Sequence, residues 1–242
     1  MKKALPINLS PIQSVLKIVP PAGAIILLAF SLGISCLDSS QNASEKEQKN
    51  ESRPSILFLG DSLTAGLGLE KFQAAPALIQ EKINQEDWNL KVINAGVSGD
   101  TTSGGLSRLN WYLRPENQIE YLIIGLGSND GMRGLSIEEM RKNIREIVKR
   151  TRKFNPDIEI FLYELQTFPS MGPEYASKFK AAFPALAKDL NLHLIPFPLK
   201  GVAGKDELNQ SDGIHPNVEG TKIMAENIWQ SIRPVLEQTR NQ

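Results

Sequence analysis

The 242-residue chain has little of what metal or nucleic-acid chemistry requires. It contains one cysteine, Cys36, and two histidines, His193 and His215, which are too few for a zinc site with the usual ligand set. Lys and Arg together number 27, as do Asp and Glu, and there is no basic stripe or tail. We therefore expect no metal, no other cofactor and no nucleic-acid partner.

Motifs of two common enzyme classes are also absent. The chain has no G-x-S-x-G, which argues against the nucleophile elbow of α/β-hydrolases. It has no G-x-x-x-x-G-K-[ST], and Gly125-Leu126-Gly127 is not followed by the third glycine of a dinucleotide-binding fingerprint. Nucleotide-binding enzymes are disfavoured for the same reason.

The apolar run near the N-terminus, AGAIILLAFSLGISCL at 22–37, is shorter than the about 20 residues that a transmembrane helix needs. It follows three lysines and ends near Cys36, a pattern typical of exported precursors. The end of the run resembles the lipobox of bacterial lipoproteins. We expect residues 1–35 to be a signal peptide and Cys36 to carry a lipid; a cleaved soluble signal and an uncleaved membrane anchor are the alternatives.

The segment after this run is almost purely polar. Residues 38–53, DSSQNASEKEQKNESR, contain one alanine and no other apolar residue, so they cannot bury enough surface to fold. We predict a disordered tether over 36–53, joined to a folded domain over 54–242. The expected product is an exported, membrane-anchored lipoprotein facing the periplasm or the cell surface, and a monomer.

From Pro54 onward, short apolar runs alternate with amphipathic stretches. This alternation predicts a parallel sheet covered on both faces, in a three-layer α/β/α domain with five strands. Ser136 and Glu139 form a capping box at the start of the clearest helix. The predicted strands are 55–60, 90–96, 121–127, 158–165 and 192–197, and the predicted helices are 71–84, 104–113, 136–154, 173–190 and 218–238.

Polar, glycine-rich segments follow the first three predicted strands. Ligands of open parallel sheets bind beyond the carboxyl ends of the strands. Gly60-Asp61-Ser62 follows the first strand, GVSGDTT the second and GLGSNDG the third. We therefore expect these three segments to meet at one edge of the sheet and to form the functional site.

A serine at that edge needs a base, because its hydroxyl is a weak nucleophile, and histidine is the base suited to neutral pH. His193 lies in an apolar run and is expected to be structural. His215 follows Asp212 by three residues in SDGIHPN, where a turn can bring the carboxylate to the imidazole Nδ1–H. The alternative is that Asp212 only caps the helix that follows.

The segments GDSL, GVSGDTT, GSND and DGIHPN, in this order, resemble the four blocks of the SGNH (GDSL) hydrolase superfamily. The segments VINAGVSGDTTSGGLSRL and GSNDGMRGL are similar in sequence to those of the bacterial exported acyl-CoA thioesterase, lysophospholipase and arylesterase group. The resemblance covers about residues 54–238. It implies a flavodoxin-like SGNH hydrolase fold and a serine esterase that acts on small-molecule or lipid acyl esters or thioesters through an acyl-enzyme, without a cofactor.

The resemblance also assigns roles to single residues. It makes Ser62 the nucleophile, His215 the general base and Asp212 the group that orients the base. The oxyanion donors would be the main-chain N–H of Ser62 and of Gly99 and the side chain of Asn129. Losing one such donor typically costs on the order of 10²–10³ in turnover. The alternatives are that Asn129 forms an Asx turn and that Gly99 is only a turn glycine.

Two stretches differ from the family pattern. Ser128 precedes Asn129 where relatives often have glycine, which affects the expected acyl-size preference. The segment 164–175 should line the acyl pocket, with Phe168 and Met171 either contacting it or packing under a loop. Two other functions stay open: a carbohydrate O-acetylesterase, and a non-catalytic lipoprotein that binds surface components.

Overall fold

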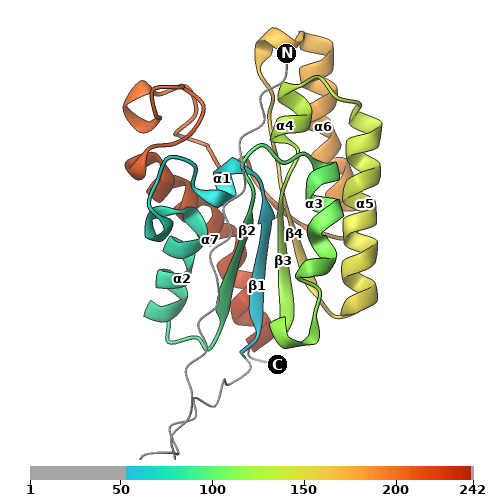
Figure 1. The fold of residues 1–242 in the computed structure, drawn as a ribbon, viewed down its shortest axis with the longest axis vertical. Coiled ribbons are helices and arrows are strands. Elements are labelled where there is room, and N and C mark those ends of the chain that lie inside the picture. The colour runs from blue at the N-terminus through green and yellow to red at the C-terminus, as the bar shows by residue number, and fades with distance from the viewer. Residues whose placement is uncertain (1–52, 241–242) are drawn as a thin grey trace, which may run out of the picture. The chain divides into compact units, whose positions relative to one another are not determined.

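The computed structural model describes residues 53–240 (Figure 1), so the predicted signal peptide, Cys36 and nearly all of the predicted tether lie outside the described residues. Five strands form a single parallel sheet in the order β2-β1-β3-β4-β5. The predicted five-stranded parallel sheet is confirmed. The strands are β1 Ser55–Gly60, β2 Lys91–Gly96, β3 Ile119–Gly125, β4 Glu159–Tyr163 and β5 His193–Ile195.

Helices cover both faces of this sheet, which confirms the three-layer architecture. Helices α2 and α7 contact each other on one face, and α3, α5 and α6 lie on the other (Figure 1). Within residues 53–240, no helix is both long and apolar enough to cross a membrane. The α-helices are α1 Ser62–Ala65, α2 Ala75–Gln85, α3 Thr102–Arg108, α4 Ser128–Met132, α5 Ile137–Phe154, α6 Pro173–Asp189 and α7 Val218–Arg240. The 3₁₀ helices are Lys71–Gln73, Leu109–Trp111, Pro115–Asn117, Pro169–Met171 and Asp206–Leu208.

The central strands are buried along their length because helices cover both of their faces. Every residue of β1 is buried, and so is every residue of β3 except Glu120. In the strand register, Gly60 pairs with Gly96 of β2 and with Gly125 of β3. The three strands therefore end at the same level, and the three polar segments that follow them start side by side.

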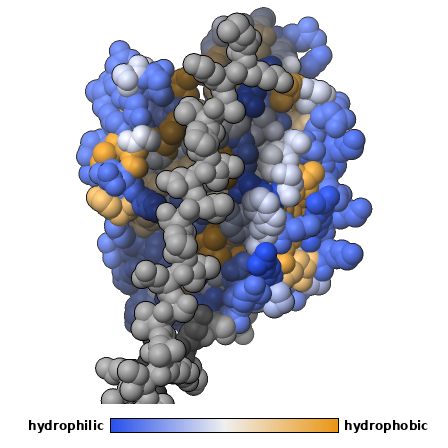
Figure 2. Space-filling model, viewed as in Figure 1, coloured by the Kyte–Doolittle hydropathy of each residue, from blue (hydrophilic) through white to orange (hydrophobic). Residues whose placement is uncertain are grey.

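Helix α5 shows how the apolar pattern determines a surface helix. Its buried side chains recur on one stripe: Met140, Ile144, Ile147, Val148 and Thr151. The Ser136 hydroxyl accepts the N–H of Glu139 at 3.3 Å, which is one half of the predicted capping box. The remaining side chains of such a helix face water, and much of the surface in Figure 2 is hydrophilic, with apolar groups in separate patches.

The structure corrects several boundaries. The third strand was predicted over 121–127 but runs from Ile119 to Gly125, which leaves Gly127 in the loop that begins the site. The second predicted helix, 104–113, is α3 followed by a 3₁₀ turn. Helices α1 and α4 were not predicted, because four or five residues are too few to show a helical period.

Candidate active site

Ser62 is held at the end of the central strand by the start of a helix. Asp61 is the N-cap of α1, and its Oδ1 accepts the N–H of Leu63 at 3.0 Å. Such a cap satisfies a main-chain donor that has no partner within the helix. Ser62 is the first residue of α1 and only 8% exposed. The strand, the cap and the short helix thus fix the main chain of Ser62 at the end of β1.

The structure brings Ser62, His215 and Asp212 into one line. The Ser62 Oγ lies 2.8 Å from the His215 Nε2, although 153 positions separate them in the chain. The His215 Nδ1 lies 2.6 Å from Asp212 Oδ2. A carboxylate only accepts hydrogen bonds, so Nδ1 carries a proton and donates it. The neutral ring then presents an unprotonated Nε2 to the serine hydroxyl.

Three donors converge on the carboxylate of Asp212. In addition to the imidazole, the main-chain N–H groups of Ile214 (2.9 Å) and His215 (3.0 Å) donate to its Oδ1. The hydrogen bond from the His215 ring, followed by these main-chain bonds, lowers the pKa of Asp212 from 3.8 to about 2. The capping alternative for Asp212 is wrong, because Asn217 Oδ1 accepts the N–H of Gly220 in the first turn of α7.

Gly99 lies in the segment after β2 with a left-handed backbone, at φ +83°. Space is not the constraint there, since an added Cβ would meet only the Arg133 Nη2, at 3.7 Å. The backbone conformation itself favours glycine. Within residues 53–240, the main-chain N–H groups of Gly99 and of Ser62 donate to no protein acceptor. Both predicted donors are free for a ligand.

Asn129 lies in the first turn of α4 and is 8% exposed. Its Nδ2 donates to the main-chain oxygen of Asp100 at 2.9 Å and lies 3.5 Å from Asp61 Oδ2. Its amide therefore bonds across to the segment that carries Gly99 rather than within its own turn, which disfavours the Asx-turn alternative. Because the contact to Asp61 is long, one N–H of the Asn129 amide is only weakly hydrogen-bonded.

Asp61 is a buried carboxyl group next to these residues, with 1% of its surface exposed. Burial raises its pKa from 3.8 to about 6, which outweighs the lowering by the Leu63 N–H and by the Ser128 side chain. A raised pKa means that the folded protein holds a proton that the unfolded chain has lost between about pH 4 and 6. The contribution of Asp61 to folding stability therefore falls as the pH rises through that window.

We expect Asp61→Asn to change how stability depends on pH. Asparagine carries no charge, so the variant escapes the loss between pH 4 and 7, which from the two pKa values is on the order of 3 kcal/mol. Urea unfolding of both proteins at pH 4 and 7 measures this difference. Asp157→Asn, at an exposed position, is the control. An equal stability difference at both pH values would contradict the assignment.

A cavity of about 400 Å³ opens beside Ser62 and His215. Its apolar lining includes Leu165, Phe168, Phe197, Leu199 and Ile214, and none of its lining residues is charged. Phe168 thus lines the cavity, which is the first of the two alternatives for this residue. Met171 does not line it and lies beside Gly134 instead. Ser128, the departure from the family pattern, also lines the cavity.

The structure adds a residue that the sequence pattern did not indicate. The Gln210 Nε2 donates to the main-chain oxygens of Leu67 (2.7 Å) and Pro216 (3.0 Å). The main-chain N–H of Gln210 donates to the main-chain oxygen of His215 at 2.7 Å. Gln210 therefore ties the loop that carries His215 to the loop after α1. No periodicity or motif marks a glutamine for such a long-range bond.

His193 lies at the other edge of the sheet. It is the first residue of β5, and its Nε2 lies 2.8 Å from Glu159 Oε2 at the start of β4. The expectation that His193 is structural agrees with this place. Among the described residues 53–240, no group of three His, Cys, Asp or Glu side chains is arranged to hold a metal ion.

The chain is similar to known proteins over most of the described residues. Residues 58–223 match the GDSL-like lipase/acylhydrolase family. The chain is similar to esterase TesA of Pseudomonas aeruginosa, with 35% identity over 75% of this chain and 89% of that protein. It is 34% identical to thioesterase 1/protease 1/lysophospholipase L1 of Escherichia coli K12, over 75% and 84% of the two chains. The crystal structure of the psychrotrophic esterase EstA from Pseudoalteromonas sp., inhibited by monoethylphosphonate, superposes with a TM-score of 0.71 at 33% identity, over 76% and 98% of the two chains.

Proposed function

The chain belongs to the GDSL-like lipase/acylhydrolase family and is an ester hydrolase, and we propose that it works through an acyl-enzyme formed on Ser62. In this proposal His215 takes the hydroxyl proton as Ser62 attacks the carbonyl carbon, and Asp212 orients the imidazole. The protonated imidazole then donates to the leaving group. The observation that carries the proposal is the hydrogen-bonded line from Ser62 Oγ through His215 to Asp212, at 2.8 and 2.6 Å.

The tetrahedral intermediate of this reaction carries a negative oxygen that needs donors already in place. We assign this role to the main-chain N–H groups of Ser62 and Gly99 and to the Asn129 amide. Support comes from the two unused main-chain donors and from the weakly held Asn129 N–H. Water then attacks the acyl-enzyme, with His215 acting as base again, and the acid is released.

The proposed substrates are esters or thioesters with an apolar acyl group. The uncharged cavity beside Ser62 supports this preference over acetylated carbohydrates, because it has room and apolar surface for more than a methyl group. We do not propose a non-catalytic surface lipoprotein, because the chain belongs to a lipase/acylhydrolase family.

We expect kcat/KM to rise with acyl length on p-nitrophenyl esters. Burying each methylene contributes about 0.8 kcal/mol, so four more methylenes, from acetyl to hexanoyl, should raise kcat/KM on the order of 10²-fold. Phe168→Ala should reduce hydrolysis of the hexanoyl ester and spare that of the acetyl ester. Activity confined to acetyl would favour the O-acetylesterase alternative. Acyl-CoA, lysophospholipid and aryl esters tested side by side then identify the leaving group.

We also propose that residues 1–35 direct export, that Cys36 carries a lipid and that 36–53 is a tether to the domain over 54–242. The sequence pattern around Cys36 supports this. Expressed as the full chain in a bacterial host, the protein should incorporate labelled palmitate and sediment with membranes, whereas Cys36→Ala should do neither. Equal labelling of the two proteins would contradict lipidation at Cys36.

A further inference from the structure

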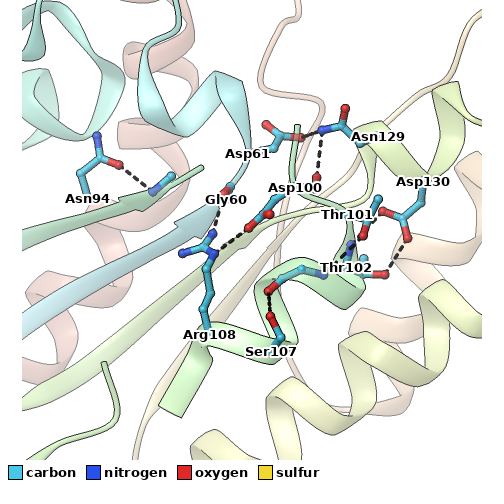
Figure 3. A network of polar contacts seen from close by, with 12 residues as sticks. Gly60, Asp61, Asn94, Asp100, Thr101, Thr102, Ser107, Arg108, Asn129 and Asp130 are labelled. Atoms are coloured by element: carbon cyan, nitrogen blue, oxygen red, sulfur yellow. Dashed lines mark hydrogen bonds and ion pairs between the residues drawn. The ribbon is translucent and has the colours of Figure 1, made fainter. Parts of the chain in front are cut away.

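A buried guanidinium lies beneath the segment that carries Gly99. Arg108 is the last residue of α3 and is 5% exposed. Its Nε donates to Asp100 Oδ2 at 2.6 Å, and its Nη2 donates to the main-chain oxygen of Gly60 at 2.9 Å (Figure 3). One side chain thus connects the end of β1 to the oxyanion loop, the name used here for residues 97–101.

Both partners of this guanidinium adjoin the proposed catalytic groups. Gly60 lies two positions before Ser62, and Asp100 directly follows Gly99. The oxygen of Gly60 also accepts the N–H of Val97 at 3.0 Å. Within residues 53–240, Arg108 is therefore one of two links that hold the oxyanion loop to the end of β1, and its loss would leave the Val97 N–H as the other.

The oxyanion loop is fixed from the other side by α4. Asn129 Nδ2 donates to the oxygen of Asp100, as described above. Asp130 accepts the N–H of Thr102 at 2.8 Å and its hydroxyl at 2.6 Å (Figure 3). From the same side, Arg133 Nη2 donates to the main-chain oxygen of Gly99 at 2.9 Å. The ion pair of Asp100 with Arg108 adds a side-chain link from the loop to the end of β1, beside the bond from the Val97 N–H.

The fold makes room for this ion pair at a specific position. A Cβ on Gly104 would lie 2.5 Å from Asp100 Oδ1, so a side chain there would displace the carboxylate. Within residues 53–240, the Arg108 Nη1 is buried without a hydrogen-bond partner. A buried ion pair is weak support for stability, and a half-satisfied one weaker still. Stability alone therefore does not explain why the pair lies here.

We propose that Arg108 is a positioning residue: with Asp100, it sets the distance between the Ser62 and Gly99 N–H groups that receive the oxyanion. This inference rests on the proposed function. Because the oxyanion exists only after attack, the effect falls on turnover more than on substrate binding. Preorganised donors lose effect steeply with displacement, since misplacement by about 1 Å can cost 10²-fold in rate.

The test is Arg108→Lys, because one ammonium cannot reach both Asp100 and the Gly60 oxygen as the guanidinium does. We expect kcat to fall about 10- to 100-fold, KM to change less than threefold and the pH profile to keep its shape. The matched control is Arg233→Gln. Arg233 also forms ion pairs, with Glu86 and Glu237, and has a buried unpartnered Nε, but it lies on α7. The Arg233→Gln variant should have a lower melting temperature and an unchanged kcat.

A second readout separates positioning from a structural role. A trifluoromethyl ketone forms a tetrahedral adduct with an oxyanion, and its inhibition constant should rise in Arg108→Lys by the same factor as kcat/KM falls. Adding methylguanidinium to Arg108→Ala should restore part of the lost kcat. A kcat within threefold of the wild type, or a loss of kcat with an unchanged inhibition constant, would overturn the inference.

If Arg108→Lys does not fold, Asp100→Asn decides by the same criteria, since it keeps the shape of the side chain and removes the charge that holds the guanidinium. Failure of the proposed function looks different. In that case the wild-type protein itself would show no hydrolysis that depends on Ser62, whatever residue stands at position 108.

Discussion

Ser62→Ala is expected to lower kcat on the order of 10⁶-fold, as loss of the nucleophile does in other serine hydrolases. The variant should fold normally, because it loses one hydroxyl and its hydrogen bond to His215 while the Asp61 cap of α1 remains. KM should change little. The residual rate reports what the proposed oxyanion donors and the cavity achieve without a nucleophile.

Labelling by a fluorophosphonate probe gives the direct measurement. The related esterase EstA was captured inhibited by monoethylphosphonate, which makes a phosphonate a suitable reagent. Wild-type protein should be labelled and Ser62→Ala should not. Ser231→Ala is the control and should be labelled like the wild type, because Ser231 lies on α7 and its hydroxyl donates to the oxygen of Asn227. Undiminished labelling of Ser62→Ala would reject the nucleophile assignment.

Asp212→Asn is expected to lower kcat about 10⁴-fold through the tautomer of His215. Asparagine can still accept the two main-chain N–H groups with its oxygen, so the loop should keep its shape. Its amide nitrogen then faces the His215 Nδ1 as a donor. The ring must accept there, which puts its proton on Nε2, where it can no longer take the proton of Ser62.

The control for the kinetics of Asp212→Asn is a second aspartate that lies close to it in the sequence but has different contacts. Asp206→Asn changes another carboxylate before the same loop, outside the hydrogen bonds to His215, and should leave kcat unchanged. Crystal structures of Asp212→Asn should show the ring of His215 in place. A variant that retains more than a tenth of the wild-type kcat would mean that the carboxylate does not control the tautomer.

Long helices were predicted from the sequence more accurately than short ones. Helix α5 was predicted within one residue, because 18 residues carry five turns of an apolar stripe. The strands before Ser62 and Gly99 were also predicted nearly correctly, since buried parallel strands are short apolar runs. Helices α1 and α4, which carry Ser62 and Asn129, were missed. Each forms because a strand end and a local turn orient it, and its own sequence shows no period.

The four sequence blocks, in their order, were enough to identify the candidate triad. A serine, a histidine and an aspartate have few other reasons to occur together in those motifs. The sequence did not distinguish an orienting Asp212 from a capping one. That depended on where α7 starts, and Asn217 occupies the cap. Arg108 was likewise part of a recognised segment, yet its two partners follow from how the last turn of α3 meets the end of β1 and the loop after β2.

The sequence by itself determined the layered α/β/α class, the parallel sheet and the residue types available for ester chemistry, because apolar periodicity and motif order are local properties of the chain. Only the tertiary structure decided which donors stay free, how Asp61 becomes a buried acid and which side chains link the loops. These depend on distances between segments far apart in sequence, such as the 2.8 Å between Ser62 and His215, and no local pattern encodes such a distance.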